Sequence, residues 1–154
     1  MQKESVKNEK LNLTKIQIAW LAGLFEGEAS FTLDKRAKKR YAVSTAPPNV
    51  SVKIVLNDED VIQTVANLLD KNVYLPKRLT IKNNQTYGCS IGDRNTLLYL
   101  LPRIYPYMGK RRKAQLDPCL KALNNWVIWF NSGGRSKMAK KRATGYIRAE
   151  RIYR

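Results

Sequence analysis

The chain has 154 residues and a formal net charge of +17, with 29 lysines and arginines against 12 aspartates and glutamates. The length predicts a single domain with a hydrophobic core. The charge indicates a polyanionic partner, and nucleic acid is favoured over an anionic membrane surface. No stretch approaches the roughly 18 apolar residues of a membrane span, and residues 1–10 contain no apolar signal core, so we expect a soluble intracellular protein.

The chain contains no histidine, which excludes histidine-based metal sites, Ser-His-Asp triads and an imidazole general base. Any hydrolysis must then depend on carboxylates, a metal ion and lysine or arginine. The two cysteines, Cys89 and Cys119, are far apart in the sequence and indicate neither a disulfide framework nor a cysteine-based zinc site. We expect both to be small buried apolar groups.

After a polar leader, residues 1–12, an apolar helix is predicted from Lys15, because Thr14 and Gln17 have the spacing of a capping box. Large apolar side chains cover most of this helix. A helix that is apolar on every side has to be buried on every side. Three small residues spaced four apart form a narrow face that suits close packing against a second helix: Ala19, Gly23 and Gly27.

The predicted helix ends in two acids, Glu26 and Glu28. Exposed carbonyl groups give a helix C-terminus a partial negative charge, so carboxylates are disfavoured there unless a positive charge compensates. A hard divalent cation such as Mg²⁺ compensates well, because it binds one or two carboxylates together with water and substrate phosphates. The alternative is a core helix whose last turn reaches solvent, where both glutamates are hydrated.

Apolar and polar residues alternate over residues 30–36 and again over residues 50–56, which predicts two strands with one buried and one polar face each. Together they make a first hairpin. A helix with acids in its first turn is predicted to follow, from residue 57 to about residue 71.

A second hairpin is predicted from residues 73–81 and 86–91, across a turn at Asn83 and Asn84. A short helix over residues 95–101, capped by Asp93, comes next. The last predicted helix covers residues 116–130, with Leu120, Leu123, Val127 and Phe130 facing inward, and Gly133 and Gly134 end it. The composition then shifts, which separates a core domain, 1–134, from a basic C-terminal extension, 135–154.

Residues Leu21 to Ala29 resemble the nine-residue signature of the LAGLIDADG homing endonucleases, in the variant whose two acids are glutamates. Ala29 departs from the signature, which usually has glycine at this position. The predicted order of helix, hairpin, helix, hairpin, helix and helix is similar to the αββαββα pattern of this α+β fold. In that fold four antiparallel strands form a saddle whose concave face lies on the DNA major groove.

The resemblance implies roles for the acids at the end of the first helix. It assigns the metal-ligand role to the Glu28 carboxylate and a supporting role to the Gly27 carbonyl. Glu26 is implied to be a structural or auxiliary acid. The implied cofactor is Mg²⁺ or another divalent cation such as Mn²⁺.

Two further positions follow from the resemblance. Asp58 corresponds to a residue that orients water near the metal ions, although a helix-capping role is an equal alternative. The segment from Lys110 to Lys113 should supply the active-site base that polarises water or offsets charge in the transition state. Arg111 is preferred for this role over Lys110 and Lys113.

The polar face of the first hairpin is predicted to contact DNA, with the second hairpin and the basic extension adding contacts. The alternatives are a solvated sheet face and a solvated tail without a role. The candidate residues are Thr32, Asp34, Arg36, Ser51, Lys53 and Val55 on the first hairpin, Lys77, Lys82 and Thr86 on the second, and Lys137, Lys140, Lys141 and Arg142 in the extension.

The chain holds one copy of the motif, whereas cutting a duplex requires two phosphodiester cleavages. We therefore expect a homodimer, joined through Ala19, Gly23 and Gly27, that cuts double-stranded DNA at a roughly palindromic target. It would act in a prokaryotic or phage-infected cytoplasm or in an organelle matrix. The alternatives are an intron RNA maturase or a DNA-binding regulator of the same fold, and a basic RNA-binding protein unrelated to the family.

Overall fold

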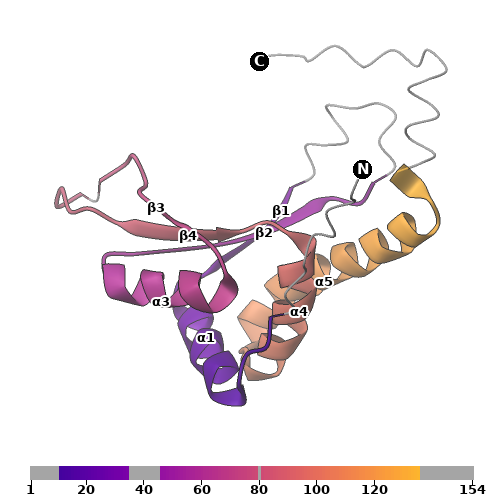
Figure 1. Ribbon diagram of the computed structural model, residues 1–154, viewed down its shortest axis with the longest axis horizontal. Helices are drawn as coiled ribbons and strands as arrows, with labels where there is room; N and C mark the ends of the chain where they lie inside the picture. The colour runs from indigo at the N-terminus through magenta and orange to yellow at the C-terminus, as the bar shows by residue number, and fades with distance from the viewer. Residues whose placement is uncertain (1–10, 35–45, 80, 136–154) are drawn as a thin grey trace, which may run out of the picture.

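The computed structural model describes residues 11–34, 46–79 and 81–135 (Figure 1). Four strands form one antiparallel sheet in the order β1-β2-β4-β3. The helices cover one face of this sheet, as Figure 1 shows, and this arrangement confirms the predicted α+β architecture. The elements are α1 (Lys15–Glu28), β1 (Ser30–Asp34), β2 (Asn49–Leu56), α3 (Glu59–Leu69), β3 (Val73–Tyr74), β4 (Tyr87–Ile91), α4 (Arg94–Ile104), the 3-10 helix η1 (Tyr105–Tyr107) and α5 (Lys110–Asn131).

Helix α1 begins at the predicted capping box. The backbone N–H of Thr14 donates to Gln17 Oε1 at 2.9 Å, and the backbone N–H of Gln17 donates to Thr14 Oγ1 at 3.2 Å. The helix ends at Glu28, and the buried Ala29 follows it in the extended conformation (φ −76°, ψ 149°). Any residue adopts these angles, so alanine in place of the usual glycine imposes no backbone strain.

The first hairpin confirms the predicted alternation of buried and polar residues. Ser30 lies opposite Lys53, and Leu33 lies opposite Val50. On β2 the residues at every second position face the helices; Val50, Val52 and Ile54 are buried and Leu56 is partly buried, whereas the residues between them face away from the helices. This alternation gives the sheet an apolar face under the helices and a polar face on its other side.

The second hairpin is shorter than the sequence predicts. Strand β3 contains only Val73 and Tyr74, which pair with Cys89 and Gly88, and residues beyond Tyr74 do not continue it. Pro76 explains the early end, because proline has no N–H to donate to a sheet. Asn83 has a positive φ of 62°, which suits the predicted turn.

The two C-terminal helices also differ from the prediction in their bounds. Asp93 caps α4 as predicted, by accepting from the backbone N–H of Thr96 at 3.0 Å, but the helix continues to Ile104. Helix α5 begins at Lys110 rather than near Leu116, so the basic segment is its first turn. The expectation that Phe130 faces inward is wrong, since 44% of its surface is exposed.

The hydrophobic core lies between the sheet and the helices. Cys89 and Cys119 belong to it, and burial raises the pKa of both thiols, which confirms them as buried neutral groups. The described part of this core contains two polar residues, Thr96 and Arg112. Among the described helices, none has the length and hydropathy that crossing a membrane requires.

Candidate active site

The C-terminal end of α1 lies against the N-terminal end of α5. The Glu26 carboxylate accepts a hydrogen bond from the backbone N–H of Gly109 at 3.1 Å, and Gly109 is the N-cap residue of α5. The partial positive charge of a helix N-terminus stabilises a carboxylate. The N-terminus of α5 therefore supplies the positive charge that we expect beside Glu26, which supports a structural role for this acid.

Arg112 compensates the carbonyl groups at the same helix end. Its guanidinium donates to the carbonyl oxygens of Glu26 at 2.8 Å and Gly27 at 3.3 Å, and to Gln115 Oε1 at 2.9 Å. The ring of Phe31 lies 5.7 Å from the guanidinium carbon. Only 6% of Arg112 is exposed, so these bonds form away from bulk water and fix α1 to α5.

Glu28 differs from Glu26 in its exposure and in its hydrogen bonding. It is exposed, and in the described ranges its carboxylate makes no hydrogen bond or ion pair. The neighbouring Gly27 carbonyl accepts one long bond from Arg112 and keeps a second lone pair. An exposed carboxylate beside a carbonyl, at the negative end of a helix, is a donor set that suits a hard cation such as Mg²⁺.

Asp58 lies at the same end of the first hairpin as Glu28. Glu28 is two residues before Ser30, and Asp58 is five residues after Lys53, the residue that pairs with Ser30, so both lie beyond the same end of the antiparallel β1–β2 pairing. Asp58 occupies the N-cap position of α3, but its side chain makes no capping hydrogen bond. The capping alternative is therefore not realised, and the carboxylate is exposed to solvent.

The basic segment, Lys110 to Lys113, contains two residues that contact other groups of the protein and two that are exposed. Arg112 is engaged with the end of α1, and Lys113 Nζ lies 5.3 Å from the centre of the Tyr105 ring. Lys110 and Arg111 are exposed in the first turn of α5. They directly follow the Gly109 that contacts Glu26, so they are the basic groups available near the end of α1.

The open face of the sheet carries the predicted polar residues of the first hairpin. Thr32 lies opposite Ser51 and Lys53 opposite Ser30, with Ser90 on the next strand. Tyr74 covers Gly88 on this face, where an added Cβ would come within 2.4 Å of the Tyr74 ring. The sequence interpretation placed Thr32, Asp34, Ser51, Lys53 and Val55 on this face, and it missed Ser30, Ser90 and Tyr74.

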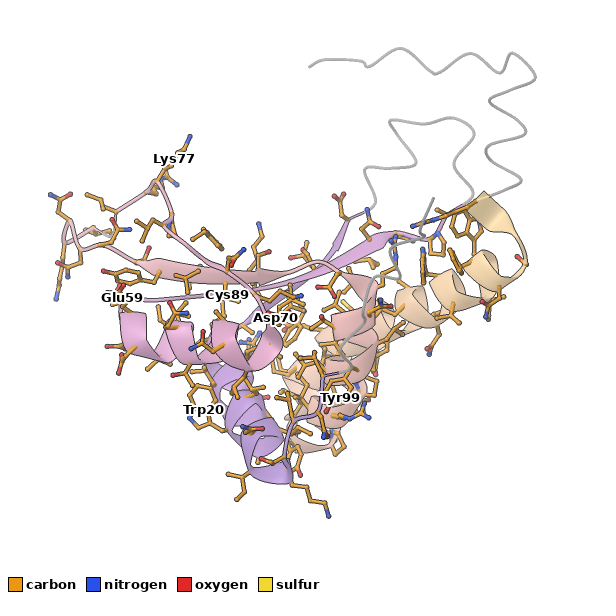
Figure 2. All side chains as sticks on the ribbon, viewed as in Figure 1. Trp20, Glu59, Asp70, Lys77, Cys89 and Tyr99 are labelled. Carbon is orange, nitrogen blue, oxygen red and sulfur yellow. The ribbon has the colours of Figure 1, made fainter. Side chains whose placement is uncertain are left out.

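The remaining predicted DNA contacts stand outside the strands or outside the described residues. Lys77, Lys82 and Thr86 belong to the connection between β3 and β4, so they lie in the loop of the second hairpin, which corrects the predicted place of Lys77 and Thr86 on its strands. Figure 2 shows Lys77 projecting from this connection on the side of the sheet opposite the helices. Five candidates lie outside the described residues: Arg36, Lys137, Lys140, Lys141 and Arg142.

The outer face of α1 is open in a single subunit. Ala19, Gly23 and Gly27 are exposed, and nothing lies within 4 Å of a Cβ built on either glycine. Ile16 is 82% exposed and Trp20 40% exposed on the same helix, and Figure 2 shows Trp20 extending away from it. The described chain therefore leaves this side of α1 uncovered, and its burial against a second helix stays a prediction.

Arg112 is the residue of the segment from Lys110 to Lys113 that the sequence interpretation missed, because the resemblance favours Arg111 there. The helical period predicts that Arg112 lies on the buried face of α5, because it precedes the buried Leu116, Cys119 and Leu123 by 4, 7 and 11 residues. Within the described residues no three histidine, cysteine, aspartate or glutamate side chains come together as a metal site. Any cation here would thus complete its coordination with groups from outside this part of the chain.

No model of a protein family matches the sequence, and no curated protein is similar to it in sequence. Similar folds occur among solved structures. The homing endonuclease I-CvuI in complex with the I-CreI target has a TM-score of 0.56 at 17% identity, over 75% of this chain and 70% of that chain. The archaeal intron-encoded homing endonuclease I-Vdi141I, complexed with DNA, has a TM-score of 0.53 at 16% identity, over 90% and 87%.

The LAGLIDADG homing endonuclease I-GzeII, in complex with its DNA target, has a TM-score of 0.52 at 15% identity, over 84% of this chain but 43% of that chain. These structures share the four-stranded antiparallel saddle and its helices with the present chain. The signature at Leu21 to Ala29 lies in α1 and the turn into β1, as the resemblance implies. The chain therefore has the fold of the LAGLIDADG homing endonucleases.

Proposed function

We propose that the protein is a site-specific endonuclease that hydrolyses double-stranded DNA as a homodimer and requires a divalent cation. The observation that carries the proposal is the position of Glu28. Its exposed carboxylate, which has no partner among the described residues, lies at the end of α1 two residues before the open polar face of the sheet begins. A DNA backbone lying on that face would bring a phosphate close to this carboxylate.

Some residues of the chain bind the duplex, and others act on the phosphate or on water. Lys53 and the hydroxyl groups of the open face contact the duplex, and the overall charge of +17 adds long-range attraction. Lys110 and Arg111 are exposed beside the end of α1, where a cationic side chain offsets the charge that develops on a phosphate. Asp58, which does not cap α3, is available to orient a water molecule.

Glu28 through its carboxylate and Gly27 through its carbonyl would hold the cation, and the DNA phosphate and water would complete its coordination. When bound, Mg²⁺ stabilises charge on the attacking and leaving oxygens of a phosphodiester. Glu26 is excluded from this set, because its carboxylate is already held by the N-terminus of α5.

The homodimer is supported by the exposed face of α1. Ala19, Gly23 and Gly27 offer a surface on which a second backbone can pack closely, and the exposed side chains of Ile16 and Trp20 flank it. One copy of this chain spans 43% of the I-GzeII chain, so two copies would span a similar length. A two-fold axis along α1 would place one Glu28 at each strand of a duplex.

The test uses a duplex that carries the flanking sequence of the protein's own gene with the gene removed. We expect the protein to cut both strands with Mg²⁺ and to bind without cutting when EDTA replaces it. Binding without cutting under both conditions would favour a maturase or a regulator of the same fold. Failure to bind this duplex, or equal cutting in EDTA, would overturn the proposal.

A further inference from the structure

Four side chains at the end of α5 contact one another in series. Arg94 lies over Trp126, with 4.6 Å between the guanidinium carbon and the ring centre, and Trp126 stacks on Phe130 with 5.0 Å between ring centres. Arg135 lies over Phe130 at 5.3 Å. We call these four residues the terminal stack. It holds two guanidinium groups in fixed positions around an aromatic pair.

The terminal stack carries two positive charges that nothing in the described chain neutralises. Neither Arg94 nor Arg135 forms an ion pair with a carboxylate there, and the neighbouring Asp93 is paired with Lys71 at 2.8 Å. Burial and the charge of Arg135 both lower the pKa of Arg94. Two cations held near each other, one of them partly buried, favour the binding of an anion.

The terminal stack adjoins the outer end of the open sheet face. Arg94 donates a hydrogen bond to the side chain of Asn49, the first residue of β2, which lies opposite Asp34 at the end of β1. Helix α5 ends beside these strands in Figure 1. Asn49 is four residues along β2 from Lys53, which is about 13 Å at about 3.3 Å per residue and equals the rise of roughly four base pairs along the axis of a duplex.

We propose that the terminal stack is a binding site for the phosphodiester backbone of duplex DNA, beyond the part of the duplex that the sheet contacts. This inference rests on the proposed function. A guanidinium binds phosphate through two parallel N–H groups, and an aromatic partner fixes its orientation before the ligand arrives. The rings already contact each other and the two guanidiniums, so the stack offers N–H groups rather than ring faces for base stacking.

The test compares two double variants that remove the same charge. Arg94→Gln with Arg135→Gln removes the terminal stack's cations. The matched control, Arg103→Gln with Lys121→Gln, removes two exposed cations from α4 and α5, and Arg103 makes the same kind of contact, with the Tyr99 ring at 3.9 Å. The full-length proteins are titrated onto a duplex of arbitrary sequence over a salt series, with fluorescence anisotropy as the readout.

At about 0.9 per lost phosphate contact, we expect the log-log salt dependence of binding to fall in the terminal-stack variant by about 1.8 for each bound subunit, which is about 3.6 for a homodimer on one duplex. It should change little in the control. Lengthening the duplex should improve the affinity of the wild type more than that of the variant. Arg94→Lys with Arg135→Lys should keep most of the salt dependence, because the charges remain. Circular dichroism melting of each variant checks that it is folded.

Equal salt dependence in the two folded glutamine variants would overturn the inference while leaving the proposed function intact. A larger loss on an RNA duplex of the same sequence would also overturn it, because the site would then favour RNA. If the wild type binds no duplex DNA, both the proposed function and the inference that the terminal stack binds DNA are overturned. If the wild type binds DNA but never cuts, only the proposed nuclease activity fails.

Discussion

The guanidinium of Arg112 donates to the carbonyl oxygen of Glu26 at 2.8 Å, across 86 residues of sequence. The bond satisfies a carbonyl that the last turn of α1 leaves without a helical partner. It also fixes the backbone two residues before Glu28 to the first turn of α5, which contains Arg111. The carboxylate and the base of the proposed site are therefore held in place by the same arginine.

Replacing this arginine should cost stability, and replacing its neighbour should not. Arg112→Met removes the donors to two helix-terminal carbonyls, and we expect it to lower the free energy of unfolding by about 2 kcal/mol. The control Arg111→Met changes an exposed side chain and should cost less than about 0.5 kcal/mol. Urea unfolding measures both. Equal losses would mean that Arg112 contributes only its charge.

The contact between Gly109 and Glu26 can be isolated by a double-mutant cycle. A Cβ at position 109 would lie 3.1 Å from Glu26 Oε1, so Gly109→Ala should weaken the bond from the Gly109 N–H to this carboxylate. We expect Gly109→Ala to cost about 0.5–1 kcal/mol more in the wild type than in a Glu26→Ala background.

The cycle is needed because alanine is intrinsically a poorer N-cap residue than glycine, and that cost is present in both backgrounds. Gly92→Ala is the matched control, since nothing lies within 4 Å of a Cβ at this position. It should change stability by less than about 0.5 kcal/mol. A Gly109→Ala cost that is the same with and without Glu26 would show that the two residues are not coupled.

The sequence predicted the parts of the fold that depend on near neighbours. The capping box of α1 spans three residues, and the alternation on β2 needs only the strand itself, so both could be recognised locally. The nine residues from Leu21 also identified the fold. Strand β3 was predicted too long because the effect of Pro76 was not weighed against the β-branched and aromatic residues around it.

The missed parts of the site depend on contacts between distant residues. The Arg112 side chain reaches a carbonyl 86 residues away, and Arg94 reaches Asn49 across 45 residues. Composition shows that both arginines are present, but only the packed structure shows which carbonyl or ring they contact. The exposed and buried members of the basic segment could be separated in the sequence only by recognising that α5 already begins at Lys110.

The exposed face of α1 gives a prediction for the dimer. Gly23→Leu adds a side chain whose Cβ has no described atom within 4 Å, and it replaces a poor helix former with a good one, so the folded subunit should gain up to about 1 kcal/mol. The same side chain would keep two α1 backbones apart, so sedimentation equilibrium should show a dimer for the wild type and a monomer for Gly23→Leu.

Thr64→Leu is the control for Gly23→Leu, because it places the same side chain on an exposed position of α3. It should leave the oligomeric state unchanged. A wild type that is monomeric at micromolar concentration would contradict the homodimer. A Gly23→Leu variant that remains dimeric would instead move the subunit interface away from Gly23.

Glu28 can be compared with Glu59, a glutamate at a helix end of the opposite polarity. Glu28 ends α1 and Glu59 begins α3, so the two carboxylates lie at helix ends of opposite polarity. Glu28→Gln should leave stability unchanged or slightly higher, whereas Glu59→Gln should lower it slightly. Both variants should bind duplex DNA at least as well as the wild type, because each removes negative charge from a basic protein.

Cutting should distinguish these variants sharply. Glu28→Gln removes the charge that a hard cation needs, and we expect cleavage of the same duplex to fall by roughly 100-fold or more, whereas Glu59→Gln should keep nearly full activity. The measurement pairs gel-shift affinity with Mg²⁺-dependent cleavage for each protein. Undiminished cutting by Glu28→Gln would remove Glu28 from the site and leave Asp58, whose exposed carboxylate follows β2, as the proposed ligand.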